Sequence, residues 1–217
     1  MWRFTLFGFP VGVQWMFWLN CALLSGALSA EGPRAIQAVA LWIAAAFISI
    51  LIHELGHAFT MRRYGDRRVS IVLYAFGGLA IPSVRRTQME DIIVSAAGPM
   101  VQIAAGLLVY YTTRSWDAPD WRISYFLGQF FWISVFWGIF NLVPIVPLDG
   151  GHILHGFLGP FRRRTTLTVS LACAVLVGLW IFQYTHSIFN LLLFGMLAYN
   201  NWQELNGRGQ FSFTNMR

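Results

Sequence analysis

The sequence contains no lysine, and charged residues of any kind make up only 11% of its 217 residues. Its formal net charge of +6 therefore comes from fifteen arginines, which stand in a few short clusters between apolar runs. Such clusters are typical of membrane orientation signals, and they indicate no nucleic-acid partner. Cysteine is also scarce. Cys21 and Cys173 lie far apart in apolar runs, which excludes a disulfide framework as the basis of the fold.

What the chain has in abundance is hydrophobic residues, which make up 57% of it. Its apolar runs repeatedly approach the roughly 20 residues that a helix needs to cross a bilayer. We therefore predict an all-α polytopic membrane protein with about six transmembrane helices and the lipid bilayer as its surroundings. The predicted spans are 14–30, 35–61, 90–113, 123–143 with an irregular continuation to about 158, 166–184 and 187–202. We expect one membrane domain over 1–205, followed by a short polar tail, 206–217.

The arginines orient these six spans. Six spans place both termini and the second and fourth loops on one side of the membrane, together with twelve of the fifteen arginines. By the positive-inside rule this side is the cytoplasm. The arginines on that side are Arg3, Arg62, Arg63, Arg67, Arg68, Arg85, Arg86, Arg162, Arg163, Arg164, Arg208 and Arg217; Arg34, Arg114 and Arg122 fall on the other.

One loop has β character. In "VSIVLYAFGGLAIP", β-branched residues are frequent, apolar residues alternate with others, and Gly77-Gly78 can provide a turn. We predict a small β-hairpin at the membrane edge near Ile71–Ala80, which the first segment, "FTLFGFPVGVQW", could join as a sheet. A loop lying on the membrane surface is the alternative.

An ionisable group inside a membrane span is costly unless it binds or pairs with something, and the second span contains "HELGH". His53 and His57 lie one helical turn apart, so both imidazoles can bind one metal ion. Glu54 neighbours that face, where a carboxylate can take the proton from a water that the metal activates. The pattern predicts hydrolysis without a protein nucleophile; a polar patch satisfied by neighbouring helices is the alternative.

A catalytic zinc usually takes three protein ligands, so a third is expected at a similar depth. Asp149 lies in "NLVPIVPLDGGHIL", where Pro144 and Pro147 should break the fourth span. Irregular backbone at membrane depth is tolerated where it lines a cavity or is buried in protein. Asp149 is therefore the natural third ligand, and a cap or turn aspartate is the alternative.

Together, "HELGHAF", "FGGLA", "SAAGPMVQ" and "NLVPIVPLDGGHIL" resemble the site-2 proteases, a family of intramembrane zinc metalloproteases. The resemblance implies one zinc held by His53, His57 and Asp149, with Glu54 as general base and acid, and a three-helix catalytic core at about 35–160. It also implies that Asn141 lies near the active site, where its amide could stabilise an oxyanion or hold substrate backbone; an ordinary interhelical hydrogen bond is the alternative.

The third span departs from the family, because Gln102 stands where the family's Gly-Pro-x-x-Asn pattern has asparagine. His152 and His155 could form a second metal site or a proton path, although interfacial hydrogen bonding is the commoner role. The sequence has room for neither the PDZ nor the CBS domain of some relatives, so we expect a minimal member, with any regulation coming from a separate membrane partner.

The function expected is hydrolysis of a peptide bond within or near a transmembrane segment of a membrane-protein substrate, such as a single-span protein, in regulated intramembrane proteolysis. The hairpin could hold the unwound substrate by strand addition. We expect a prokaryotic plasma membrane and an active site toward the cytoplasmic half. The alternatives are a membrane metal transporter or sensor and a non-catalytic protein that binds transmembrane helices.

Overall fold

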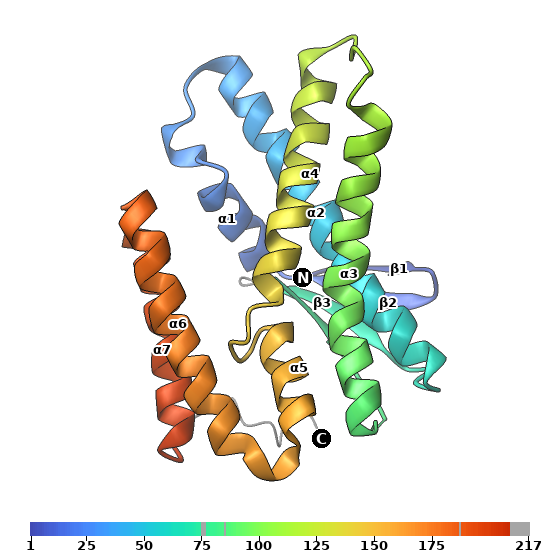
Figure 1. The fold of residues 1–217 in the computed structure, drawn as a ribbon. Coiled ribbons are helices and arrows are strands. Elements are labelled where there is room, and N and C mark those ends of the chain that lie inside the picture. The colour runs from blue at the N-terminus through green and yellow to red at the C-terminus, as the bar shows by residue number, and fades with distance from the viewer. Residues whose placement is uncertain (75–76, 85, 187, 209–217) are drawn as a thin grey trace. The chain divides into compact units, whose positions relative to one another are not determined.

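The structure is a computed structural model that describes residues 1–74, 77–84, 86–186 and 188–208 (Figure 1). Helices account for most of these residues. The strands are β1 (Trp2–Leu6), β2 (Phe9–Val13), β3 (Ser70–Tyr74) and β4 (Gly77–Ile81). The helices are α1 (Trp15–Leu24), η1 (Ala27–Ser29), α2 (Gly32–Arg63), α3 (Gln88–Thr113), α4 (Trp121–Asn141), α5 (Asp149–Leu158), η2 (Pro160–Arg162), α6 (Arg163–Thr185) and α7 (Ile188–Leu205).

The chain divides into two compact units. The first unit comprises Met1–Val84 and Ala97–Phe140, and the second comprises Arg85–Ala96 and Asn141–Arg217. The expected single domain over 1–205 stays a prediction. The polar tail expected at 206–217 lies, beyond Arg208, outside the described residues.

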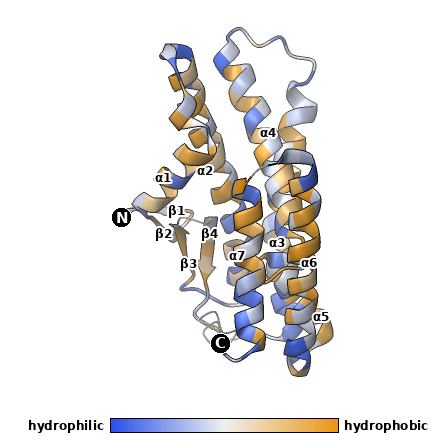
Figure 2. Ribbon diagram, turned by 90° about the vertical axis from the view of Figure 1, so that its left-hand side faces the viewer, coloured by the Kyte–Doolittle hydropathy of each residue, from blue (hydrophilic) through white to orange (hydrophobic). Residues whose placement is uncertain are grey.

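Four helical segments among the described residues are long and apolar enough to cross a membrane: α2, α3, α4 and Pro160–Thr185. Apolar residues recur along these helices, with paler and hydrophilic stretches between them (Figure 2). The helical membrane fold is therefore confirmed. The count of six spans stays a prediction, because the expected first span contains the ten-residue apolar helix α1 and the short helix η1.

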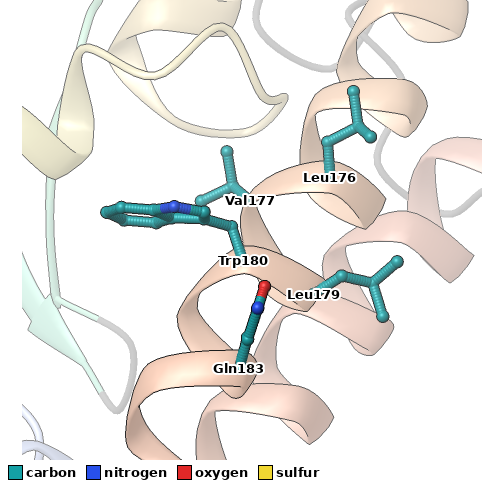
Figure 3. A pocket seen from close by; sticks show the side chains of 5 residues that line it. All are labelled: Leu176, Val177, Leu179, Trp180 and Gln183. Carbon is teal, nitrogen blue, oxygen red and sulfur yellow. The ribbon is translucent and has the colours of Figure 1, made fainter.

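The surface of α6 carries large exposed apolar side chains, as expected of a helix that faces lipid. Leu176, Leu179 and Trp180 are each more than half exposed. They line a shallow hollow together with Val177 and Gln183, all on this one helix (Figure 3). None of the predicted metal ligands lines this hollow, so it is a feature of the apolar surface.

The predicted sheet is present in the first unit, with strand order β1-β2-β3-β4. β1 and β2 are antiparallel and joined by a two-residue turn, Phe7-Gly8, whose φ values of 50° and 79° suit a tight hairpin. β2 runs parallel to β3, with Val11 opposite Ile71, which confirms that the first segment joins the hairpin. Figure 1 shows the strands beside α2, against which β3 and β4 pack.

The role expected for Gly77-Gly78 was wrong. Both glycines lie inside β4, opposite Tyr74 and Leu73 of β3, and not in the turn. Residues 75 and 76, which join the two strands, lie outside the described residues. Gly78 has a different role within the strand, because a side chain there would overlap the Glu54 carboxylate, whereas a Cβ at Gly77 would meet no atom within 4 Å.

Two polar contacts hold the sheet to its surroundings in the first unit. Arg62, at the end of α2, donates a hydrogen bond to the Phe7 carbonyl at 2.9 Å and lies over the Phe9 ring. Asp66, 1% exposed, accepts hydrogen bonds from the Ser83 backbone N–H and hydroxyl, both at 2.6 Å, and from the N–H groups of Arg68 and Val84. Burial raises the pKa of Asp66, but these hydrogen bonds outweigh it and hold the pKa below its ordinary value.

The predicted break in the fourth span is confirmed. α4 ends at Asn141, an irregular segment that contains Pro144 and Pro147 follows, and α5 begins at Asp149. The Val146–Pro147 peptide bond is cis.

Candidate metal centre and catalytic site

The two histidines of α2 form a converging pair. Their Nε2 atoms lie 3.0 Å apart, and the side chains are only 5% and 7% exposed for His53 and His57. Two nitrogens bound to one tetrahedral zinc at roughly 2.0–2.1 Å stand about 3.4 Å apart. The imidazoles therefore already present their nitrogens at nearly the separation that a shared zinc requires, which supports the donor set on geometric grounds.

Glu54 is buried between this pair and the sheet, with 3% of its surface exposed. Its carboxylate lies directly against Gly78 of β4, at a position where any Cβ would overlap it. The pKa of Tyr74, on the neighbouring strand, is raised by burial and then by the charge of Glu54. The carboxylate therefore lies directly against strand backbone.

Glycines also bring α3 close to the histidines. A Cβ at Gly56 would lie 2.8 Å from the Ala97 carbonyl oxygen and 3.0 Å from the Gly98 Cα, so the two helices approach closely there. A Cβ at Gly98 would overlap the His57 imidazole. The small residues of the third span therefore make room for a metal-binding side chain as well as for helix packing.

Gln102, whose role sequence analysis left open, is fully buried and reaches His53 from α3. Its Oε1 lies 2.8 Å from Nδ1 of His53, and its Nε2 donates to the Ser49 hydroxyl at 2.9 Å. Ser49 Oγ lies 2.9 Å from Ser134 Oγ on α4. Sequence analysis missed both serines. The one available signal was that Ser49 precedes His53 by four residues and so shares its helix face.

Asp149 belongs to the second unit, where it is the first residue of α5 and half-buried. The turn before it is tight: a Cβ at Gly150 would overlap the Leu142 carbonyl group, and one at Gly151 would lie 2.6 Å from the Val146 nitrogen. These glycines allow the chain to fold back immediately before the helix. An acidic residue in the first turn is also favoured by the helix dipole, so the position suits a capping role as well as a ligand.

Two helices of the second unit fix this turn through the backbone of Val146. Ser170 of α6 accepts a hydrogen bond from the Val146 N–H at 3.2 Å, and Asn201 of α7 donates to the Val146 carbonyl at 2.7 Å. Asn201 is 1% exposed. Sequence analysis did not identify either residue, because each resembles an ordinary polar residue in an apolar helix.

The remaining candidates are placed as follows. Asn141 is the last residue of α4 and half-buried, and its role near the active site stays a prediction. Nδ1 of His155 lies 3.2 Å from the Thr166 hydroxyl of α6, which favours the hydrogen-bonding role over a second metal site. His152 lies on the same short helix, α5, and its role stays open.

A buried HExxH motif on a long apolar helix, beside a small sheet, is typical of a membrane protein of the metallopeptidase type. Comparison with known families is specific: the model of peptidase family M50 matches residues 41–118 and 113–183. The chain belongs to peptidase family M50, and its resemblance to the site-2 proteases is confirmed.

Individual relatives agree with this assignment. A protein of Methanocaldococcus jannaschii named as a zinc metalloprotease is 25% identical over 91% of this chain and 54% of its own length. The stage IV sporulation protein FB of Bacillus subtilis is 31% identical over 73% of this chain and 57% of its own length. The chain spans about half the length of the curated relatives it matches.

The fold has a solved counterpart. The structure titled as a site-2 protease from Methanocaldococcus jannaschii superimposes with a TM-score of 0.68 over 94% of both chains, at 22% sequence identity. At that identity the match establishes the fold alone.

Proposed function

We propose that the chain is an intramembrane zinc metalloendopeptidase that hydrolyses a peptide bond within or near a transmembrane segment of a membrane-protein substrate, in regulated intramembrane proteolysis. The observation that carries the proposal is the buried, converging pair of His53 and His57 with Glu54 beside it, on a helix long enough to span a membrane. Membership of a peptidase family and a relative named as a zinc metalloprotease support it.

One zinc ion per chain is held, in this proposal, by His53, His57 and Asp149. Two imidazoles and one carboxylate are a donor set typical of catalytic zinc, and they leave the fourth position open. Each residue is positioned within its own unit: the histidines by α2, and Asp149 by the tight turn that Gly150 and Gly151 permit. When bound, zinc polarises the scissile carbonyl and makes water a nucleophile near neutral pH.

Glu54 acts as the general base and general acid in this proposal. Its buried carboxylate takes a proton from the attacking water and later delivers it to the nitrogen of the leaving amine. Gly78 leaves the space that this carboxylate needs, and the backbone of β4 limits where it can move. The amide of Asn141 is proposed to hold the developing oxyanion or the substrate backbone.

A substrate helix must unwind before its peptide bond can be attacked, because its amides are engaged in internal hydrogen bonds. Strand β4 ends the four-stranded sheet and pairs with β3 on one side only among the described strands. An unwound single-span substrate can add to the other edge of β4 and recover main-chain hydrogen bonds. Because Gly78 of β4 touches Glu54, a segment bound there would run beside the general base.

The same proposal places the protein in a prokaryotic plasma membrane with both termini in the cytoplasm. Arg62 and Arg63 end α2 only five and six residues after His57, about 8–9 Å at 1.5 Å per residue. An active site in the cytoplasmic half follows if these arginines mark the boundary. A separate membrane partner is the expected source of regulation.

The test uses purified full chain in detergent or liposomes with candidate single-span proteins. Glu54→Gln should keep one zinc per chain and lose cleavage by about 100-fold or more, since general acid-base catalysis contributes roughly 10²–10⁴-fold. A zinc chelator should abolish wild-type cleavage, and added zinc should restore it. Cleavage that survives both treatments would show that the site does not carry out the reaction.

A further inference from the structure

We propose that Gln102 is a positioning residue for the metal site: it fixes the tautomer and ring orientation of His53, while Ser49 and Ser134 fix Gln102. The four residues are called the Gln102 relay. The proposal rests on the proposed function, because it assigns a purpose to a contact with one of the proposed zinc ligands.

The relay is a continuous chain of hydrogen bonds across three helices of one unit. It runs from Nδ1 of His53 to Oε1 of Gln102 over 2.8 Å, from Nε2 of Gln102 to Ser49 Oγ over 2.9 Å, and from there to Ser134 Oγ over 2.9 Å. Gln102, Ser49 and Ser134 are each 0% exposed. Bulk solvent therefore does not compete for these groups.

The chemistry of the amide gives the relay its direction. Oε1 only accepts hydrogen bonds, so its place beside Nδ1 puts the single proton of a neutral His53 imidazole on Nδ1. Nε2 is then the nitrogen that carries the lone pair, and it is this atom that faces Nε2 of His57 at 3.0 Å. The opposite tautomer would carry a proton on Nε2 and block metal binding there.

Ser49 prevents the amide from turning over. A glutamine amide in isolation can rotate by half a turn and exchange its oxygen for its NH₂ group. Ser49 accepts from Nε2 and has Ser134 as a partner for its own hydroxyl, so the amide is held at both ends. Removing Ser49 should therefore weaken zinc binding although this residue touches no proposed ligand.

The length of glutamine matters as well. Asparagine, which the family pattern has at this place, is one carbon shorter and would withdraw the carbonyl oxygen from Nδ1 by about 1.5 Å. In this chain the relay reaches His53 because α3 carries the longer amide. The length of Gln102 thus matches the distance to His53, and we expect that asparagine cannot replace it without loss of this contact.

The experiment measures zinc affinity directly, by competition between the full chain in detergent and a chromophoric chelator, with Zn²⁺ alone as the probe. Gln102→Met keeps the length and removes the acceptor, and we expect a loss of 10–100-fold in affinity. Gln102→Glu keeps an acceptor for the Nδ1–H group and should stay within about threefold of wild type. Ser49→Ala should lose affinity as well, and by less than Gln102→Met.

Helicity and thermal unfolding of each variant serve as the folding control. Equal affinities for Gln102→Met, Ser49→Ala and wild type would overturn the relay and leave the proposed protease intact. If Gln102→Glu bound zinc as weakly as Gln102→Met, the relay would also be overturned. The two variants differ in whether they keep an acceptor for the Nδ1–H group of His53, and a merely structural role of Gln102 would not depend on that acceptor. A wild-type chain that binds no zinc would overturn both the relay and the proposed function.

Discussion

Replacing Gly78 by alanine should separate catalysis from metal binding. The Cβ of alanine would overlap Cγ, Cδ and Oε1 of Glu54, well inside ordinary van der Waals separation. Since β4 is held by its pairing with β3, the flexible carboxylate is the group that gives way, by about 1 Å. A misplacement of this size in a catalytic group costs on the order of 100-fold in rate.

The assay compares kcat of Gly78→Ala and wild type on one single-span substrate, with bound zinc measured in the same samples. We expect kcat to fall by about 100-fold and zinc to stay at one per chain, because Glu54 is not a ligand. Gly128→Ala is the matched control: a Cβ there meets no atom within 4 Å, and its kcat should stay within about twofold. Wild-type turnover by Gly78→Ala would refute the inference that β4 positions Glu54 for catalysis.

Three other substitutions test separate parts of the structure. Gly98→Ala places a methyl group where the His57 ring lies, so zinc affinity by chelator competition should fall about 10-fold or more, and an unchanged affinity would count against the proposed ligand. The folded-state pKa of Asp66 lies below its ordinary 3.8, so its stabilising effect is fully present above that pH and is lost as the pH falls through the folded-state pKa. Asp66→Asn should therefore lower the free energy of unfolding by about 1–3 kcal/mol at pH 7, as measured by thermal denaturation. The difference between this variant and wild type should shrink below pH 3.8. Asn201→Leu removes the donor to the Val146 carbonyl and should lower zinc affinity while helicity stays unchanged; full affinity would show that this contact does not position the turn.

The sequence was most informative where chemistry is local. His53 and His57 lie one turn apart on one helix, so spacing alone predicts their shared face with Glu54 beside it, and in the structure the two histidine Nε2 atoms lie 3.0 Å apart. The break before Asp149 was predictable for a similar reason, since Pro144 and Pro147 act on their own neighbourhood.

Contacts between distant segments were harder to predict. Gly77 and Gly78 have the composition of a turn, and only the position of Glu54 beneath β4 explains why a glycine stands at position 78 of a strand. Ser49 and Ser134 form a buried hydrogen bond between residues 85 positions apart, and no spacing rule connects them. The way the helices pack determines which side chains these serines meet, and this packing cannot be read from a single sequence.

The bare backbone of Gly78 has a consequence for how a protease with the proposed site can diversify. Because a Cβ there would overlap Glu54, this position cannot be varied to suit a different substrate without disturbing the proposed general base. Leu79 and Ile81, on the same strand, are 42% and 40% exposed and carry no such constraint. Selection for new cleavage preferences would therefore act on Leu79 and Ile81, while the glycine of β4 that lies against Glu54 stays fixed.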